Sequence, residues 1–304
     1  MDLLIIGVGQ FGSALAHMYQ RQGRRVRKIE NSQSLTNFSE NILSNSISLL
    51  CVPTQSFPKL MEQRGDVLSR SYCLVSTAKG LIQDTGHTPT ECLRSHFPKG
   101  PPIFALSGPS FSTEINKGQP TALVLAGNTE RQLNSVIDTL STRQLRLYKS
   151  LDRRGVELCG ALKNVYAIAA GISAGLGFGD STRAALMTRA LAEMSRTGQS
   201  LGGQPLTFFG LAGVGDLFLT CSSPLSRNFQ FGYGLAKGKT SKKLLLKLGT
   251  VEGVWTASAA KKVCHQHKIR TPLLDMVVAL LEKKINPQEA LERLMTRKIR
   301  HEFD

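Results

Sequence analysis

A glycine-rich turn near the N-terminus constrains the fold of this chain more than any other feature. Residues 3–6 are all apolar, and apolar residues recur at helical spacing from Gly12 onward. Between them lie Gly7, Gly9 and Gly12 in the pattern G-x-G-x-x-G, with a predicted strand before the turn and a predicted helix after it. The first glycine permits a tight turn, the second lets the backbone approach a pyrophosphate, and the third lets the helix pack on the strand. The turn therefore predicts a dinucleotide-binding fold, in which the helix N-terminus offers N–H groups to the phosphates.

An acidic residue follows the turn at a meaningful distance. Glu30 lies 18 residues after Gly12, near the spacing of about 20 at which a carboxylate binds the ribose hydroxyls of NAD. A carboxylate there repels a 2′-phosphate, so the sequence favours NAD over NADP. Four basic residues in the same region could receive that phosphate and leave NADP open: Arg24, Arg25, Arg27 and Lys28.

Short apolar runs alternate with helical segments through the first half of the chain. Further strands are expected at 26–29, 47–52, 72–76, 103–106, 122–126 and 145–148, and helices at 57–68 and 130–140. This alternation predicts an α/β, Rossmann-type, doubly wound and mostly parallel sheet over residues 1–150. Ligands of such sheets bind at the carboxyl ends of the strands, where residues 77–80 and 107–111 follow two of the runs.

The second half of the chain has a different pattern. Strand-like runs nearly vanish after residue 150, and helical periodicity predicts an all-helical domain over 151–304. Lys163 and Asn164 lie there among glycines and alanines, which favour close helix packing and burial of the lysine. Asp216 and Thr220 are four residues apart and share one helix face, and Arg227 carries donors suited to phosphate. A structural Asp–Arg ion pair is the alternative for these residues.

Seven motifs in order carry a resemblance to a known family. They are the glycine turn, Thr77–Gly80, Ser107–Phe111, Gly160–Asn164, Gly215–Leu217 with Thr220–Cys221, Ser226–Asn228 and Val251–Gly253. In this order the chain resembles the NAD(P)-dependent glycerol-3-phosphate dehydrogenases of the bacterial type over nearly its whole length. The resemblance implies that the helical domain is similar to the C-terminal domain of 6-phosphogluconate dehydrogenase.

The resemblance also implies roles for individual residues. Lys163 would be the proton acceptor, oriented by Asp216, with Asn164 and Thr220 steadying the substrate oxygens and Lys79 contributing positive charge. The substrate would be held by Lys79, Gly108, Ser110, Lys163, Asp216, Ser226, Arg227 and Asn228. The sequence pattern already assigns Gly7, Gly9, Gly12 and Glu30 to the dinucleotide. The resemblance adds six more residues: Gln10, Phe11, Lys79, Ser112, Arg227 and Glu252.

The implied reaction is hydride transfer between a nicotinamide and the dihydroxyacetone phosphate/sn-glycerol 3-phosphate pair, which supplies glycerol phosphate for phospholipid synthesis. NAD or NADP would be the cofactor, with NAD favoured and no metal, and a homodimer is expected. The chain departs from the family in a shorter segment after the second strand, residues 31–45, in Phe11 where tryptophan is commoner, and in Ser112 where alanine is usual.

Composition narrows the classes of partner. The net charge is +16, and residues 237–304 carry half of it, mostly interleaved with apolar residues as on solvated helix faces, so nucleic acid is not expected. Six scattered cysteines and the absence of a signal peptide predict a reduced, cytoplasmic protein without membrane insertion. Two alternatives stay open: another dehydrogenase of the 3-hydroxy acid/6-phosphogluconate type, and a non-catalytic nicotinamide-sensing or polyanion-binding module.

Overall fold

The chain folds into two compact units. The structure, a computed structural model, describes residues 1–30, 43–299 and 301–302. Unit 1 comprises residues 1–79 and 87–157, and unit 2 comprises 80–86 and 158–304. The predicted division between residues 150 and 151 lies just ahead of the long helix α7 (Arg153–Gly175), whereas the units divide inside α7. The first turn of α7 stays with unit 1 because the Glu157 carboxylate accepts hydrogen bonds from the Thr88 hydroxyl and the Thr90 amide, both at 2.8 Å.

Unit 1 is an α/β sandwich. Its strands are β1 (Asp2–Ile6), β2 (Val26–Ile29), β3 (Ser46–Leu50), β4 (Cys73–Ser76), β5 (Ile103–Ser107), β6 (Thr121–Ala126) and β7 (Leu145–Ser150). Its helices are α1 (Gln10–Arg21), α3 (Phe57–Leu68), α4 (Pro89–His96), α5 (Ser112–Asn116) and α6 (Glu130–Leu140), with a 3-10 turn at Thr54–Ser56. Each of the predicted strands is present, so the predicted fold class is confirmed.

The sheet has the order β2-β1-β3-β4-β5-β6-β7, with all neighbours parallel except β5 and β6. The strand order steps outward on both sides of β1 and β3, so their carboxyl ends form the edge at which a doubly wound sheet binds ligands. Strand β2 lies at the end of the sheet, which explains how it accommodates the charged Arg27 and Lys28 that are unusual in an inner strand.

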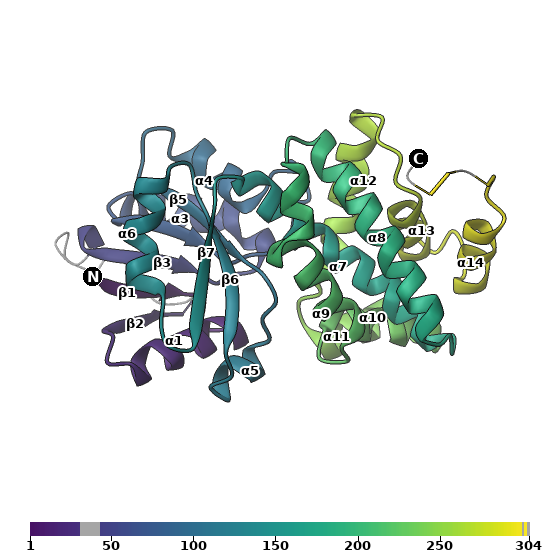
Figure 1. Cartoon of the computed structure of the whole chain (residues 1–304), viewed down its shortest axis with the longest axis horizontal. Helices are drawn as coiled ribbons and strands as arrows, with labels where there is room; N and C mark the ends of the chain where they lie inside the picture. The colour runs from purple at the N-terminus through teal and green to yellow at the C-terminus, as the bar shows by residue number, and fades with distance from the viewer. Residues whose placement is uncertain (31–42, 300, 303–304) are drawn as a thin grey trace. The chain divides into compact units, whose positions relative to one another are not determined.

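Helices cover both faces of this sheet (Figure 1). On one face α1, α5 and α6 pack on alternating strand residues such as Leu3, Ile5 and Val75 to form one continuous core. The Tyr19 hydroxyl of α1 donates to the Leu140 carbonyl at the end of α6 at 2.9 Å, which satisfies a polar group inside this core. Helices α3 and α4 pack against each other on the opposite face. The core thereby fixes the position of α1 relative to the turn that precedes it.

Unit 2 is built from helices in its described part. After α7 come α8 (Asp180–Ser200), α9 (Asp216–Ser222), α10 (Arg227–Ala236), α11 (Ser241–Leu248), α12 (Glu252–Gln266), α13 (Pro272–Leu281) and α14 (Pro287–Met295). A 3-10 segment at Pro205–Phe209 and a π-helical turn at Leu211–Gly215 connect α8 to α9. Figure 1 shows α7 surrounded by α8, α9, α10 and α12.

Glycines let α7 and α10 touch backbone to backbone. A Cβ atom added at Gly171 of α7 would collide with the Phe229 carbonyl of α10, and one added at Gly232 of α10 would collide with the Ile168 carbonyl of α7. Helix α7 is long and apolar enough to cross a membrane, but 89% of its apolar window is buried inside the protein. It is therefore the core helix of unit 2, and this burial is what places Lys163 in the interior.

Residues 80–86 belong to unit 2 although they leave unit 1 directly after β4. The Leu81 amide donates to the Thr256 hydroxyl of α12 at 3.4 Å, and Lys262 of α12 donates to the Asp84 carbonyl at 3.0 Å. Two side chains of α12 thus attach this excursion to unit 2.

Candidate active site

The glycine turn of unit 1 has the geometry that its sequence predicts. Gly7 has a φ of 94°, and a Cβ atom there would lie 2.7 Å from the Cys51 carbonyl oxygen, so only glycine fits. A Cβ atom at Gly12 would collide with the Gly7 carbonyl, which shows how closely α1 approaches β1. Gly9, by contrast, has nothing within 4 Å of an added Cβ atom and caps α1 without a side-chain hydrogen bond. Open space beside the bare N-terminus of α1 fits a pyrophosphate, with Gln10 and Phe11 in the first turn of the helix.

The acidic residue predicted to bind ribose lies at the carboxyl end of β2. Glu30 directly follows β2 and is exposed. Of the four nearby basic residues, Arg25 and Arg27 lie 3.9 Å and 3.7 Å from the Asp2 carboxylate. Asp2 begins β1 and lies opposite the start of β2, so these two guanidinium groups are held at the amino ends of the strands, away from Glu30 at the carboxyl end. The shortened segment 31–45 lies outside the described residues except for 43–45.

A second group of predicted residues gathers beyond β4 and β5 in unit 1. The Lys79 ammonium donates to the Gly108 carbonyl at 2.8 Å, and the Ser110 hydroxyl donates to the same oxygen at 3.3 Å. Lys79 and Ser110 are half-buried, and Ser112 begins the short helix α5 immediately afterwards. The neighbouring parallel strands β4 and β5 therefore bring Lys79 to Gly108, which lies 29 positions later in the sequence.

In unit 2, Lys163 and Asp216 form a buried ion pair. The Lys163 Nζ donates to Asp216 Oδ1 at 2.5 Å and to the Thr220 Oγ1 at 2.7 Å, and the Lys163 and Asp216 side chains are 7% and 1% exposed. The Thr220 hydroxyl also donates to the Asp216 carbonyl at 2.6 Å. Asp216 and Thr220 together fix the direction of the lysine side chain. The Thr220 hydroxyl, which the sequence assigned to substrate oxygens, contacts the lysine and its partner.

Local structure explains how Asp216 reaches the lysine. The π-helical turn at Leu211–Gly215 runs directly into α9, so Asp216 stands at the first position of that helix. Gly213 within the turn lies so close to the Phe208 carbonyl that a side chain would collide with it. Single π-helical turns are rare and occur frequently at functional sites, because they re-aim the residues that follow. The glycine-rich stretch before Asp216 in the sequence thus encodes an unusual helix start.

A second buried network adjoins the ion pair. The Asn228 Nδ2 donates to Asn164 Oδ1 at 2.9 Å, and the Gly253 amide donates to Asn228 Oδ1 at 2.9 Å. Asn164 donates in turn to the Gly160 carbonyl at 3.2 Å. Asn228 is held from both sides, and a Cβ atom at Gly253 would lie only 2.5 Å from the Asn164 carbonyl. The role of the Gly253 amide was not predicted, although the motif Val251–Gly253 marked its location.

The remaining predicted residues lie at helix starts in unit 2. Ser226 caps α10, and its buried hydroxyl accepts from the Phe229 amide at 3.2 Å. Arg227, the first residue of α10, is exposed. Glu252 begins α12, next to Gly253. An exposed guanidinium beside a helix N-terminus is suited to an anionic group such as phosphate.

Electrostatics distinguishes reactive from inert groups near the ion pair. Burial raises the pKa of the Cys221 thiol to about 12, despite the positive charge of Lys163, so this cysteine stays a neutral thiol. Within the residues that the structure describes, no group of three or more His, Cys, Asp or Glu side chains could hold a metal ion. The buried pair of oppositely charged side chains beside this thiol is Lys163 with Asp216.

Two family models match the chain in sequence. Residues 29–133 match the model of the NAD-dependent glycerol-3-phosphate dehydrogenase N-terminus, and residues 152–292 match the model of the C-terminus of the same enzyme. The second match contains the ion pair and the asparagine network.

Named relatives resemble the chain over its whole length. It is 40% identical over 302 residues to a glycerol-3-phosphate dehydrogenase [NAD(P)+] of Acaryochloris marina, covering 99% of this chain and 97% of the relative. It is 41% identical to the enzyme of the same name from Synechococcus sp. strain JA-3-3Ab, with the same coverage. A crystal structure of glycerol-3-phosphate dehydrogenase from Coxiella burnetii superposes with a TM-score of 0.89 at 32% identity, covering 97% of this chain and 99% of that one.

Proposed function

The chain belongs to the family of NAD(P)-dependent glycerol-3-phosphate dehydrogenases, and we propose how its own residues carry out that reaction. It is an oxidoreductase that interconverts dihydroxyacetone phosphate and sn-glycerol 3-phosphate with a nicotinamide dinucleotide. The observation that carries the residue assignment is the buried ion pair of Lys163 and Asp216, held by Thr220. Neither another type of hydroxy-acid dehydrogenase nor a non-catalytic sensor is favoured by the named relatives.

Lys163 is the proton donor for ketone reduction. Its ion pair with Asp216 stabilises the ammonium form, so the lysine holds the proton that the new hydroxyl oxygen requires. When bound, the nicotinamide supplies or accepts the hydride at the carbon that carries this oxygen. In the oxidative direction the neutral amine of Lys163 takes up the hydroxyl proton, and Asp216 stabilises the ammonium as it forms.

Asp216, Thr220 and the asparagine pair are positioning groups in this proposal. Two hydrogen bonds fix the direction of the Lys163 side chain, so that little reorganisation accompanies proton transfer. Asn164 and Asn228, locked by the Gly253 amide, present fixed amide groups next to the lysine for the substrate hydroxyls.

Arg227 and the N-terminus of α10 bind the phosphate. The phosphate does not react, and the free energy of its binding aligns the neighbouring carbonyl carbon with the lysine. Ser226 contributes by capping α10, which keeps the first turn of this helix intact around Arg227.

The dinucleotide binds at the Gly7–Gly12 turn, with NAD preferred over NADP. The open space at Gly9 and the bare start of α1 support the pyrophosphate position. The carboxylate of Glu30 at the carboxyl end of β2 supports the preference for NAD, and so does the position of the Arg25 and Arg27 guanidinium groups against Asp2 at the opposite end of the strands. In the cell, we expect a cytoplasmic homodimer that is not inserted in a membrane and that supplies glycerol phosphate for phospholipid synthesis.

A spectrophotometric assay tests this assignment. Oxidation of NADH and of NADPH is followed with dihydroxyacetone phosphate, and unphosphorylated dihydroxyacetone is the control. We expect turnover with the phosphorylated ketone and faster turnover with NADH. The Arg227→Ala variant should raise KM for the phosphorylated ketone and leave the slow reaction of the control ketone unchanged. Equal rates for both ketones in the unmodified protein would contradict the phosphate role of Arg227.

A further inference from the structure

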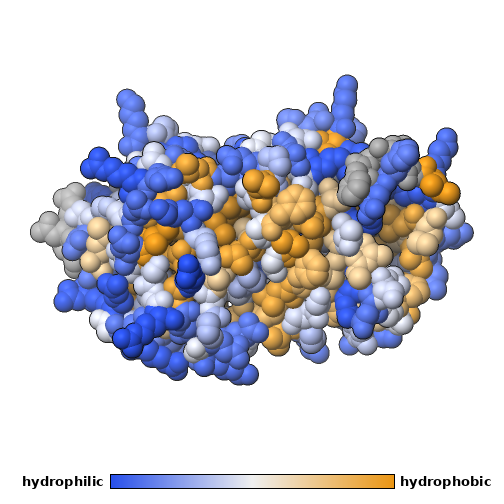
Figure 2. Space-filling model, viewed as in Figure 1, coloured by the Kyte–Doolittle hydropathy of each residue, from blue (hydrophilic) through white to orange (hydrophobic). Residues whose placement is uncertain are grey.

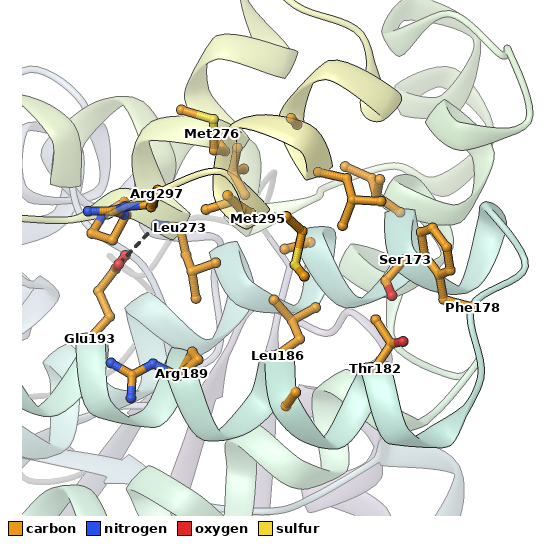
Figure 3. Close-up of a pocket in the computed structure, with 18 of the residues that line it drawn as sticks. Ser173, Phe178, Thr182, Leu186, Arg189, Glu193, Leu273, Met276, Met295 and Arg297 are labelled. Atoms are coloured by element: carbon orange, nitrogen blue, oxygen red, sulfur yellow. Dashed lines mark hydrogen bonds between the residues drawn. The ribbon is translucent and has the colours of Figure 1, made fainter. Parts of the chain in front are cut away.

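A cavity of about 430 Å³ lies within unit 2, and none of the residues assigned to the reaction lines it. Its walls come from α7, α8, α13 and α14 and from the segment that follows α14 (Figure 3). The volume falls within the range of about 300–1,000 Å³ that is usual for sites of small organic molecules. The cavity is therefore large enough to be a binding site separate from the catalytic residues.

Most of the cavity wall is hydrocarbon. All lining residues of α13 and α14 are apolar, and α7 and the first half of α8 add Ile172 and Leu186 beside the hydroxyls of Ser173 and Thr182. Leu186, Met276 and Leu294 are only half-buried, and Met295 is 76% exposed. On the face shown in Figure 2, hydrophobic residues are exposed over unit 2 beside strongly hydrophilic ones. Apolar surface that the protein leaves uncovered around a hollow marks a place where another molecule binds.

Basic residues outnumber acidic residues around this cavity. Five of the described residues that line it are Lys or Arg: Arg189, Arg196, Arg270, Arg297 and Lys298. Only two are carboxylates. The Glu193 oxygens accept hydrogen bonds from the Leu273 and Leu274 amides, both at 2.9 Å, so this charge is compensated by the N-terminus of α13. The second carboxylate, Glu302, is exposed.

Two of these basic residues, Arg189 and Arg297, lie at one end of the cavity. In Figure 3, Glu193 lies at the same end. Leu186 and Met295 lie in the middle, and Phe178 lies at the far end. An adjoining cavity of about 250 Å³ shares Arg270 and Arg297 and adds Arg293 and one carboxylate, Asp275. Arg189 donates to the Glu302 carbonyl at 2.7 Å, and the buried Nε of Arg196 has no hydrogen-bond partner among the described residues. The hollow is thus cationic at one end and apolar along the rest.

We propose that this cavity binds a single-chain amphipathic anion, a fatty carboxylate, with its hydrocarbon chain along Leu186 and Met295 and its carboxylate at Arg189 and Arg297. The charge and the apolar length of the cavity match the two parts of such a molecule. A second copy of this chain is a poorer match, because it would bring a net charge of +16 toward a cationic rim. A membrane surface is a poorer match because a concave wall accepts one chain rather than a plane.

Calorimetric titration of the full chain with decanoate below its micellar concentration tests the proposal. We expect saturable binding of one molecule per chain. Octanoate, which is two methylenes shorter, should bind on the order of tenfold more weakly. Decyltrimethylammonium, which has the same chain and the opposite charge, should not bind.

Variants locate the bound molecule. Leu186→Trp fills the middle of the cavity and should abolish decanoate binding. The double change Arg189→Gln with Arg297→Gln should weaken it about tenfold, because charge-assisted hydrogen bonds to the carboxylate are lost. Lys242→Gln on α11 removes an exposed charge that does not line the cavity and should leave binding unchanged. Circular dichroism and turnover of dihydroxyacetone phosphate establish that each variant is folded.

Three results would overturn the proposal. The first is the absence of saturable binding by the unmodified protein. The second is equal decanoate affinity in the folded double arginine variant and in Lys242→Gln. The third is a change in molar mass by light scattering when Leu186 is replaced by Trp, because a second copy of the chain would then cover this face.

Discussion

The two units place their functional groups in opposite ways. In unit 1 the proposed dinucleotide turn is made of backbone, and the features that we assign to it are the open space at Gly9 and the start of α1. In unit 2 the working groups are side chains, of which Lys163, Asp216 and Asn228 are all buried and hydrogen-bonded to one another or to neighbours. A backbone site tolerates change in exposed side chains, whereas a buried network fails when one partner is removed. Four experiments sharpen this contrast.

The largest effect is expected from the centre of the unit 2 network. Lys163→Ala removes the proton donor and should lower kcat by roughly 10²–10⁴-fold, which is the usual contribution of general acid catalysis. Binding of NADH, followed by its fluorescence, should change little because the proposed cofactor turn is in unit 1. Lys163→Arg is the matched control, since it keeps the positive charge but not the readily transferable proton. Near-normal turnover of the alanine variant would show that the lysine is not the donor.

A second experiment uses pH to test the cost of buried charge in unit 2. Burial raises the pKa of Glu193 from 4.5 to about 7, and Asp275 adds to this effect while the Leu273 and Leu274 amides and Arg196 oppose it. The folded state thus binds this proton more tightly than the unfolded state. The resulting stability is fully present below pH 4.5 and is lost as the pH rises through 7, by about 3 kcal/mol in total.

Urea denaturation across this pH range should show the loss in the unmodified protein. The amide of Glu193→Gln does not titrate, so the loss of unfolding free energy between pH 4.5 and 7 should be absent in this variant. The substitution can also change the unfolding free energy by a constant amount, which does not affect the slope with pH. Identical pH slopes in the two proteins would contradict the raised pKa.

A smaller effect is expected at the backbone site. Gly9→Ala places a methyl group in open space at ordinary φ, so stability should change little, but the methyl group would stand where a pyrophosphate approaches. We expect NADH affinity to fall about tenfold, or about 1.4 kcal/mol. Gly179→Ala is the matched control, because Gly179 also precedes a helix, α8, with open space around it. Loss of stability in Gly9→Ala without loss of affinity would place the dinucleotide elsewhere.

The smallest effect concerns cofactor choice. Glu30→Ala removes the carboxylate that repels a 2′-phosphate and should raise kcat/KM for NADPH a few-fold while lowering it for NADH. Asp2→Ala is the matched control, because its contact with Arg25 and Arg27 lies at the amino end of the strands and its loss should leave the NADH to NADPH ratio unchanged. An unchanged ratio of kcat/KM for NADH to kcat/KM for NADPH in Glu30→Ala would show that this carboxylate does not determine cofactor preference.

Local sequence patterns were sufficient for the sheet and the turn. The apolar runs and the glycine spacing depend on a few neighbouring residues, and strands such as β5 and helices such as α6 appear where periodicity places them. The motif residues Lys163 and Asp216 could also be found, although they lie 53 positions apart, because each stands in a distinctive context.

Contacts between residues far apart in the sequence could not be predicted from local patterns. The sequence does not show that the Thr220 hydroxyl contacts the lysine, nor that the Gly253 amide holds Asn228, because both depend on helix packing. The contact of Glu193 with the start of α13, 80 residues later, and the cavity beside it leave no pattern at all. Sequence reasoning also placed the domain division before α7, because it could not see that Thr88 and Thr90 hold Glu157.

The assignment of residues 80–86 to unit 2 affects how the chain folds during synthesis and where it can be divided into fragments. The partners of this segment, Thr256 and Lys262, leave the ribosome long after the strands on either side of it, so β4 and β5 can pair before these residues find their place. A fragment ending near residue 157 would carry a strip of unit 2 with nothing to bind, and a fragment starting at 158 would lack that strip. Expression of unit 1 alone therefore requires deletion of residues 80–86, and expression of unit 2 alone requires that these residues be added to it. Dividing the chain at one position does not separate the two units.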